Sequence, residues 1–205
     1  MNMSKKPSKK GFAIILSSPS GGGKSSLAKA LISMNSKLIM SISATTRKPR
    51  PNDIEGINYF FKSRDEFMKM VNNGELLEYS EIYDNLYGIP REFIELQFNQ
   101  ANNVLFDIDS QGAYKLKNIL SNSVISIFIL PPSLQELRNR LVSRNQDDPK
   151  EIDRRMNLAA IEIAEAKNYD YVVINDDFSK TVNQIYNLIT KEMTKRRGIW
   201  QAKKK

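Results

Sequence analysis

The chain contains no cysteine and no histidine among its 205 residues. Without cysteine there can be no disulfide and no thiolate metal site, which fits a reducing cytosol. Without histidine, catalysis by an imidazole base and zinc bound by histidine are both excluded. Apolar runs are also short, far below the roughly 20 residues of a membrane-spanning helix. We therefore expect a cytoplasmic protein with no membrane contact, and residues 1–16 do not resemble a secretory signal.

The formal net charge is +8, but the positive charge is concentrated at the two ends of the chain. Residues 1–10 carry four lysines, residues 195–205 carry six basic residues, and neither stretch contains an acid. Without these ten, 21 basic residues face 23 acidic ones, a balance of about −2. This pattern predicts solvated basic tails at 1–10 and 197–205. Weak contact with RNA or an acidic partner is the less favoured alternative, and we expect no specific nucleic-acid partner.

A glycine-rich stretch near the N-terminus organises the rest of the chain. The apolar run 12–16 predicts a buried strand, and Leu27, Leu31 and Met34 share one face of a helix predicted to begin at Lys24. Between them lies the turn 17–23, SSPSGGG. A strand, a glycine-rich loop, Lys-Ser and a helix are the layout of a P-loop, which binds nucleotide phosphates.

The residue types of this loop suit a triphosphate. Glycine lets the backbone curl closely because it tolerates positive φ and has no Cβ, and a helix N-terminus presents free N–H groups to anions. Lys24 is expected at the β- and γ-phosphates and the Ser25 hydroxyl at Mg²⁺. The residues predicted to bind ATP here are Ser18, Pro19, Ser20, Gly21, Gly22, Gly23, Lys24, Ser25 and Ser26.

One position departs from the P-loop pattern G-x-x-x-x-G-K-[ST]. Ser18 stands where the first glycine belongs. The alternative interpretation is a glycine-rich turn followed by a surface lysine. The flanking strand and helix favour the P-loop, because they are the context that the motif requires.

Strands alternating with helices predict an α/β fold with a parallel sheet flanked by helices. Residues 38–97 interrupt this alternation with short strands and turns, so we predict an insertion beside the sheet. Within it, Ser63 and Glu66 match a helix capping box, and 85–88 is expected to be a turn. Ser133 and Glu136 match a second capping box.

Arginines gather near the C-terminal part of the predicted core. Arg140, Arg144 and Arg155 flank the polar stretch 145–150. In P-loop enzymes an arginine at the transferring phosphoryl group raises the rate by roughly 10³–10⁵. The arrangement suits a lid that closes over ATP and excludes water. Spacing alone leaves open the alternative of solvated surface arginines.

The insertion carries a second set of phosphate-binding side chains. Arg47, Arg50, Tyr59 and Tyr87 could grip a phosphate, because arginine presents a planar fork of donors and tyrosine a hydroxyl. Glu78 is predicted to lie in a strand beside them. A basic surface loop with core tyrosines is the alternative, and spacing alone does not decide between the two.

With these residues in view, the chain from about Gly11 to Lys195 resembles the guanylate kinases. The matching stretches are SPSGGGKSS (18–26), TTRKPRP (45–51), EGINYFF (55–61), LLEYSEIYDNLYG (76–88), FDIDSQG (106–112), FILPPS (128–133) and VINDD (173–177). Their order and spacing are specific, although no single piece beyond the P-loop is decisive. The resemblance implies a P-loop core at 11–37 and 98–196, a GMP-binding insertion at 38–97 and a small helical lid at about 138–156.

The resemblance also implies a reaction, transfer of the ATP γ-phosphoryl group to GMP with Mg²⁺ to give ADP and GDP, in purine nucleotide metabolism. It places Ser43, Glu78 and Asp109 at the guanine base. Guanine offers adjacent N–H donors at N1 and N2, which one carboxylate can accept together. Adenine lacks that pair, so a site that leaves a buried carboxylate unpaired should reject AMP.

The remaining roles are likewise implied by the resemblance. The GMP phosphate is expected at Arg47, Arg50, Tyr59 and Tyr87, with Gly88 beside them. Asp107 matches an acid near the metal and phosphates, directly or through water; a purely structural acid is the alternative. Lys24, Arg140, Arg144 and Arg155 match catalytic positions, and Asn175 falls near the adenine pocket. No histidine is needed, because the nucleophile is a GMP phosphate oxygen that is already ionised.

Two further departures concern the insertion and the lid. Ile89-Pro90 follows Tyr87-Gly88 where the family often has a hydroxyl residue, which removes one hydrogen bond to the GMP phosphate and could raise the KM for GMP. Asn145 replaces a glycine that is common after the lid arginine, which could stiffen that loop or bend it through the left-handed region.

Two alternatives to GMP phosphorylation stay open at this stage. A catalytically silent relative would bind phosphorylated partners through Arg47, Arg50 and Tyr59; intact Lys24, Ser25 and lid arginines speak against it. An enzyme of the same class could instead act on another nucleoside monophosphate, and Glu78 is the residue that discriminates. We expect only ATP and GMP as small-molecule partners, and a monomer or homodimer.

Overall fold

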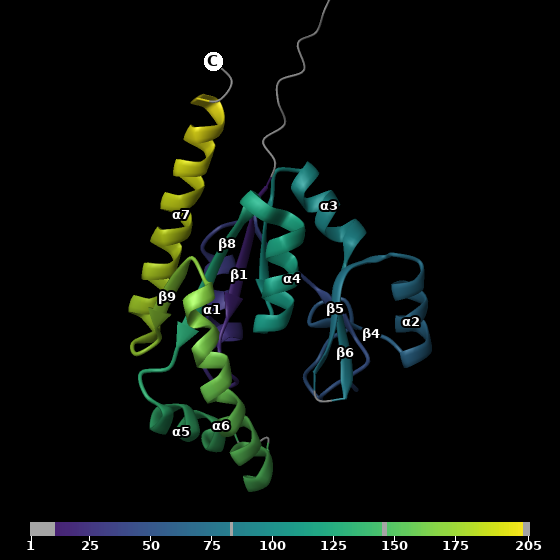
Figure 1. Ribbon diagram of the computed structural model, residues 1–205, viewed down its shortest axis with the longest axis vertical. Coiled ribbons are helices and arrows are strands. Elements are labelled where there is room, and N and C mark those ends of the chain that lie inside the picture. Colours follow the sequence, from purple (N-terminus) through teal and green to yellow (C-terminus); the bar gives the residue numbers. More distant parts are fainter. Residues whose placement is uncertain (1–10, 83, 145–146, 203–205) are drawn as a thin grey trace, which may run out of the picture.

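The computed structural model describes residues 11–82, 84–144 and 147–202 (Figure 1). The predicted tail 1–10, the Asn145 departure and the last three residues lie outside this part of the chain. Residues 197–202, predicted as part of a C-terminal tail, belong to the long helix α7 (Phe178–Ala202).

A five-stranded parallel sheet forms the first layer of the molecule. Its strands are β1 (Ala13–Ser17), β2 (Leu38–Met40), β7 (Asn103–Asp107), β8 (Val124–Leu130) and β9 (Tyr171–Ile174), in the order β2-β7-β1-β8-β9. Every residue of β1 is buried, as expected for a parallel sheet covered on both faces. Leu38–Met40 was predicted to open the insertion, but the strand pairs with β7 in this sheet.

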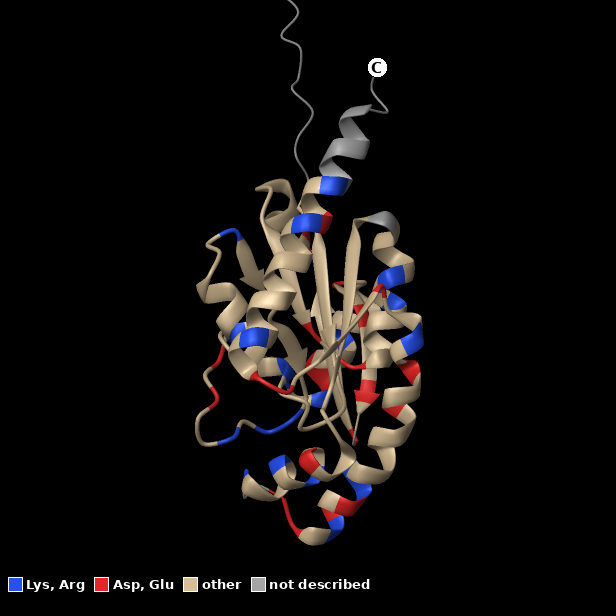
Figure 2. Ribbon diagram, turned by 90° about the vertical axis from the view of Figure 1, so that its left-hand side faces the viewer, with Lys and Arg blue, Asp and Glu red and all other residues tan. Residues whose placement is uncertain are grey.

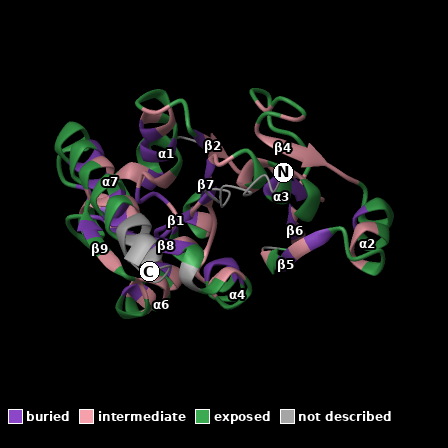
Figure 3. Ribbon diagram, turned by 90° about the horizontal axis from the view of Figure 1, so that it is seen from above, coloured by how far each residue is buried: buried purple, intermediate pink, exposed green. Residues whose placement is uncertain are grey.

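Helices cover both faces of the five-stranded sheet. Along β1, Ile14 and Leu16 pack toward α1 (Lys24–Ser33) and α7, while Ala13 and Ile15 pack toward α3 (Arg91–Asn99) and α4 (Ser110–Leu120). Viewed from above, the buried residues gather in the central strands between these layers (Figure 3). The sheet therefore holds its carboxyl ends rigidly, and in open α/β sheets ligands bind at those ends.

A second, four-stranded sheet lies beside the first (Figure 3). Its order is β4 (Tyr59–Phe61), β3 (Ser43–Thr45), β6 (Asn85–Pro90) and β5 (Leu76–Ile82), and α2 (Arg64–Asn72) packs on it through Phe67. The Ser63 capping box is confirmed: Glu66 N–H donates to Ser63 Oγ at 3.2 Å, and the Glu66 carboxylate accepts from Ser63 N–H at 2.7 Å.

The prediction of a turn at 85–88 was wrong. These residues begin strand β6, which pairs with β3 on one side and β5 on the other. Asp84 has a positive φ of 61°, so the chain reverses just before the predicted turn. Position 88 of this strand requires a glycine, because a Cβ there would lie 2.7 Å from Leu76 Cδ1 and 2.9 Å from Phe67 Cζ.

Two helices, α5 (Leu134–Ser143) and α6 (Pro149–Ala164), pack together beyond the sheet, and both carry acidic and basic side chains (Figure 2). Arg138 Nη1 lies 2.8 Å from Asp153 Oδ1 and joins them. Ser133 Oγ accepts from Glu136 N–H at 3.0 Å, but the Glu136 carboxylate binds Arg140 instead of completing the predicted box. Short 3₁₀ turns, Ser121–Ser123 and Glu165–Asn168, follow α4 and α6.

Candidate functional site

A cleft of about 300 Å³ opens at the carboxyl ends of β1 and β7, a size within the usual range of ligand pockets. The P-loop forms one wall, the second sheet another, and α6 closes part of a third. Many of the predicted site residues line it: Ser18, Pro19, Ser20, Gly21, Gly22, Gly23, Lys24, Ser25, Ser43, Arg50, Tyr59, Glu78, Tyr87, Gly88, Asp107, Asp109, Arg144 and Arg155. Ser26, Arg47, Arg140 and Asn175 are not part of this lining.

The P-loop curls through two glycines in the left-handed region. Gly21 has a φ of 94° and Gly23 a φ of 92°, conformations that favour glycine. Gly23 is also the residue before α1, so the free N–H groups of that helix face the cleft. Ser18 has no positive φ and is buried, with Oγ donating to the Pro19 carbonyl at 3.0 Å. Its position therefore does not need a glycine.

Asn175 supports the P-loop from behind. Its Nδ2 donates to the Gly22 carbonyl at 2.9 Å, and the side chain is buried. A Cβ at Gly23 would lie only 2.5 Å from the same Nδ2, so the asparagine also fixes the space available to the loop. The adenine contact expected of Asn175 stays a prediction.

Lys24, Ser25 and Asp107 form one polar cluster at the base of the cleft. Lys24 Nζ lies 3.2 Å from Asp107 Oδ1 and donates to the Ile108 carbonyl at 3.3 Å, while Ser25 Oγ donates to Asp107 Oδ2 at 2.5 Å. Burial lowers the pKa of Lys24, but the charge and hydrogen bond of Asp107, together with the charges of Asp109 and Glu162, raise it, so the pKa lies above its ordinary value. The lysine is therefore a fixed positive charge beside the loop N–H groups.

The same cluster offers oxygen donors to a magnesium ion. Mg²⁺ is usually held by one or two carboxylates together with substrate phosphates, rather than by an all-protein cage. Within the described ranges no group of three or more acidic side chains is arranged to bind a metal. One carboxylate and one hydroxyl, Asp107 and Ser25, therefore fit an ion that arrives with a nucleotide.

The lid arginines fall into two environments. Arg155 of α6 donates to Ser20 Oγ at 3.1 Å and lies 2.9 Å from Asp147 Oδ1 and 3.1 Å from Glu151 Oε1, which connects the helix pair to the P-loop. Arg144 lines the cleft without an ion pair to any described residue. Arg140 faces Glu136 at 2.8 Å and donates to the Asn175 carbonyl at 3.1 Å, outside the cleft lining.

Glu162 is a cleft residue that the sequence analysis missed. It lies two helical turns after Arg155 on α6, and this i, i+7 spacing places both on one face, which could have revealed it. Burial raises the pKa of Glu162, while Lys24 and the N–H of Ser20 act in the opposite direction. Ser80, Ile82 and Ile108 complete the lining and were also missed.

Two carboxylates face each other on the second-sheet side of the cleft. Asp109 caps α4 by accepting from Gly112 N–H at 2.9 Å, and Glu78 of β5 is only 8% exposed. A Cβ on Gly112 would lie 3.2 Å from Asp109 Oδ1 and 3.3 Å from Glu78 Oε1, so both groups approach one point. Burial, reinforced by Asp109 and opposed by Lys115, raises the pKa of Glu78 to about 7.

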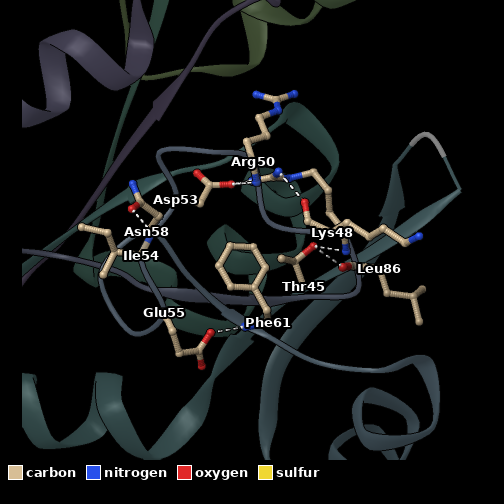
Figure 4. A network of polar contacts seen from close by, with 10 residues as sticks. Thr45, Lys48, Arg50, Asp53, Ile54, Glu55, Asn58, Phe61 and Leu86 are labelled. Carbon is tan, nitrogen blue, oxygen red and sulfur yellow. Dashed lines mark hydrogen bonds and ion pairs between the residues drawn. The ribbon is translucent and has the colours of Figure 1, made fainter.

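The loop before β4 separates the roles of its two arginines (Figure 4). Arg47 is held by Asp53 at 2.8 Å, donates to the Lys48 carbonyl at 2.9 Å and lies 5.2 Å above the Tyr59 ring. Burial would raise the pKa of Asp53, but hydrogen bonds from the Arg50 N–H and Arg47 lower it overall. The Arg50 guanidinium points away from this network and lines the cleft, so it is available to an anion.

This arrangement places a P-loop with its Lys-Ser pair and a buried carboxylate pair on one cleft. The sequence profile of the guanylate kinase family matches residues 10–192. The chain belongs to the guanylate kinase family. The guanylate kinase of Rickettsia felis is 52% identical over 186 residues, which cover 91% of this chain and 96% of that protein. The guanylate kinase of Wolbachia pipientis wMel is 46% identical over 186 residues, with 91% and 92% covered.

A solved guanylate kinase shares the fold. The crystal structure of guanylate kinase from Anaplasma phagocytophilum superposes with a TM-score of 0.76 at 36% identity, covering 90% of this chain and 87% of that one. The predicted α/β class with a P-loop core is thereby confirmed. The domain boundaries at 97, 138 and 156 stay predictions. No helix in the described part of the chain is long and apolar enough to cross a membrane.

Proposed function

We propose that the chain transfers the γ-phosphoryl group of ATP to GMP, giving ADP and GDP. One observation carries the proposal. Asp107 and Asp109, two residues apart at the end of β7, face opposite halves of the same cleft. Asp107 contacts Lys24 and Ser25 of the P-loop, and Asp109 meets Glu78 of the second sheet. This brings a triphosphate subsite and a base-recognition subsite together at a fixed separation.

The donor subsite binds ATP through the P-loop. Its N–H groups and Lys24 surround the β- and γ-phosphates, because the loop glycines and the start of α1 present donors to the cleft. Ser25 and Asp107 would hold the Mg²⁺ that accompanies ATP. The ion would supply positive charge that offsets the charge of the phosphates.

The acceptor subsite orients GMP. Ser43, Glu78 and Asp109 accept and donate hydrogen bonds at the guanine edge, and Arg50, Tyr59 and Tyr87 hold the phosphate. Arg47 acts behind them by fixing the loop through Asp53 and the Tyr59 ring. The attacking oxygen belongs to an ionised phosphate, so no side chain has to remove a proton, and alignment and charge stabilisation supply the rate.

The lid arginines supply positive charge near the transferring phosphoryl group. Arg155 is already connected to the P-loop through Ser20. Arg144 has no ion-pair partner among the described residues, so it can turn toward the transferring group without breaking an existing pair. Arg140 donates to the Asn175 backbone carbonyl, and the Asn175 side chain donates to the Gly22 carbonyl.

Product analysis by ³¹P NMR tests this proposal. The protein is incubated with ATP, Mg²⁺ and GMP, and the phosphorus resonances are followed over time. We expect ADP and GDP to form in equal amounts, with no inorganic phosphate. Formation of ADP and inorganic phosphate, or no reaction while a phosphorylated peptide binds, would overturn the assignment.

A further inference from the structure

Lys115 of α4 lies beside the carboxylate that the proposed function assigns to guanine. Its ammonium is 3.8 Å from Glu78 Oε2, and it donates to Ser80 Oγ at 3.2 Å. Ser80 in turn donates to the same Glu78 oxygen at 3.3 Å. The ammonium also donates to the Tyr79 carbonyl and lies 5.6 Å from the centre of the Tyr79 ring.

We propose that Lys115, assisted by Ser80, is a positioning residue for recognition of the acceptor base, which keeps the Glu78 carboxylate charged and oriented to accept the two N–H groups of guanine. The inference rests on the proposed function, since it names what controls one of its binding groups. Lys115 itself need not touch the nucleotide, because it is absent from the cleft lining and acts through Glu78 and Ser80.

The electrostatics of the cleft explain why such a residue is needed. Glu78 is buried beside the carboxylate of Asp109, and both influences favour its protonated form. A protonated carboxyl group cannot accept two N–H donors through its pair of oxygens as a carboxylate does. Among the described residues, Lys115 is the cation in an ion pair with Glu78. It therefore supplies the opposing charge.

The other titratable and charged groups around Glu78 do not replace Lys115. They are Asp109 from the turn before α4, Tyr87 from the neighbouring strand β6, and Tyr59 and Arg50, which line the same cleft. Asp109 is a second carboxylate, and the two tyrosines bring hydroxyl groups but no positive charge. Arg50 belongs to the part of the cleft that we assign to the GMP phosphate, whose charge it would neutralise.

The Ser80 hydroxyl connects Lys115 to Glu78 through two hydrogen bonds. It accepts from the lysine and donates to the carboxylate, which favours the ionised form of Glu78 and fixes one of its oxygens. Side chains alternate along a strand, so Glu78 and Ser80 share the cleft-facing side of β5. Glu81 points to the other side and pairs with Arg64 of α2 at 3.6 Å, where both side chains are exposed.

The test replaces Lys115 with methionine, which retains an unbranched apolar side chain but removes the charge. Lys115→Arg restores the charge, and Arg64→Gln serves as the matched control, because it removes an ion pair from the opposite face of the same strand. The pKa of Glu78 is measured by ¹³C carboxyl NMR in the nucleotide-free protein. KM for GMP and for ATP are measured from pH 6.5 to 8.5.

We expect the pKa of Glu78 to rise by about one unit in Lys115→Met, as is typical when a neighbouring opposite charge is lost. The ionised fraction at pH 7 then falls, so KM for GMP rises about 5-fold at pH 7 and by less than about 2-fold at pH 8.5. KM for ATP stays unchanged. Lys115→Arg and Arg64→Gln behave like wild type, and Ser80→Ala gives a smaller shift in the same direction.

The outcomes separate this inference from the proposed function. An unchanged pKa of Glu78 in Lys115→Met overturns the inference, as does a rise in KM for GMP that is independent of pH or equal to that for ATP. A purely structural role of Lys115 would give one of those results. Absence of GMP phosphorylation by the wild-type protein would instead overturn the proposed function, and the NMR titration would still decide whether Lys115 controls Glu78.

Discussion

Single residues at the end of β7 connect the two halves of the cleft. Asp107 holds Lys24 and Ser25, and the acidic groups around Lys24, Asp107 foremost, together raise its pKa above the ordinary value despite burial. Lys24→Ala removes the lysine cation from the phosphate subsite. We expect kcat to fall by about 10²-fold or more, the scale found when one transition-state donor is lost. Circular dichroism should show an unchanged fold, and turnover near the wild-type rate would contradict the P-loop assignment.

Glu78 provides the residue-scale test of base recognition. Glu78→Gln keeps the shape of the side chain but loses the negative charge and one acceptor. Leaving a guanine donor unpaired costs about 1–3 kcal/mol, so KM for GMP should rise roughly 10-fold or more. KM for ATP should be unaffected, because the P-loop lies on the other wall of the cleft. Glu81→Gln, on the opposite face of β5, is the control, and equal increases in both KM values would argue against guanine recognition at Glu78.

At the scale of elements, the P-loop depends on the strand–helix unit and on the Asn175 support behind it. Gly23 has a φ of 92°, and a Cβ there would lie 2.5 Å from Asn175 Nδ2. Gly23→Ala therefore adds both backbone strain and a clash, and we expect a loss of stability of about 1–3 kcal/mol together with weaker ATP binding. Urea unfolding and ATP titration calorimetry measure the two effects.

Gly74→Ala separates the effect of backbone strain from the effect of the clash with Asn175. Gly74 has a φ of 66°, but an added Cβ would have no atom within 4 Å. This variant should lose only about 1 kcal/mol of stability from backbone strain and bind ATP normally. If both variants lost the same stability and both bound ATP normally, Asn175 would have no part in shaping the loop.

At the scale of the whole molecule, Glu78 makes folding stability depend on pH. Its pKa is about 7 in the folded protein and 4.5 as the ordinary value, so between these values the folded state holds more protons than the unfolded state. Stability therefore falls as pH rises from about 4.5 to 7 and levels off above, by at most about 3 kcal/mol from this group. Glu78→Gln lacks this contribution.

The measurement is the difference in free energy of unfolding between wild type and Glu78→Gln, determined by urea denaturation from pH 4.5 to 8.5. As pH rises to about 7, the free energy of unfolding of the variant should increase relative to that of the wild type, and above pH 7 the difference should stay constant. A difference that does not change with pH would contradict the raised pKa of Glu78.

Local patterns in the sequence predicted the parts of this fold that local physics determines. The apolar run of β1, the glycines of the P-loop and the Ser63 capping box each depend on neighbouring residues, and the structure confirms them. The predicted turn at 85–88 was wrong because Asn85 and Gly88 favour turns, whereas pairing with β3 and β5 made this segment a central strand. Tertiary pairing outweighed local preference there.

In the site too, contiguous motifs were predictable from the sequence, whereas contacts between distant elements were not. Sequence reasoning found most of the residues that line the cleft, because the P-loop and the family's motifs are contiguous. It did not separate Arg47 from Arg50, since only the folded loop shows Arg47 held by Asp53 and Arg50 lining the cleft. It missed Glu162 and Lys115, which reach the cleft region from helices distant in sequence. The i, i+7 spacing from Arg155 was the available signal for Glu162, whereas the contacts of Lys115 depend on packing between α4 and β5, which spacing along the chain does not encode.

The central claim is that Asp107 and Asp109, at the carboxyl end of β7, connect a P-loop to a guanine-binding pocket, and acceptor selectivity tests it most directly. ADP release is measured in a coupled assay with ATP and Mg²⁺, comparing GMP, AMP, UMP and CMP at equal concentrations. The account predicts rapid ADP release with GMP and at most traces with the other three. Equal or faster turnover with AMP would contradict the assignment of Glu78 and Asp109 to guanine, and no turnover with any monophosphate would contradict the kinase itself.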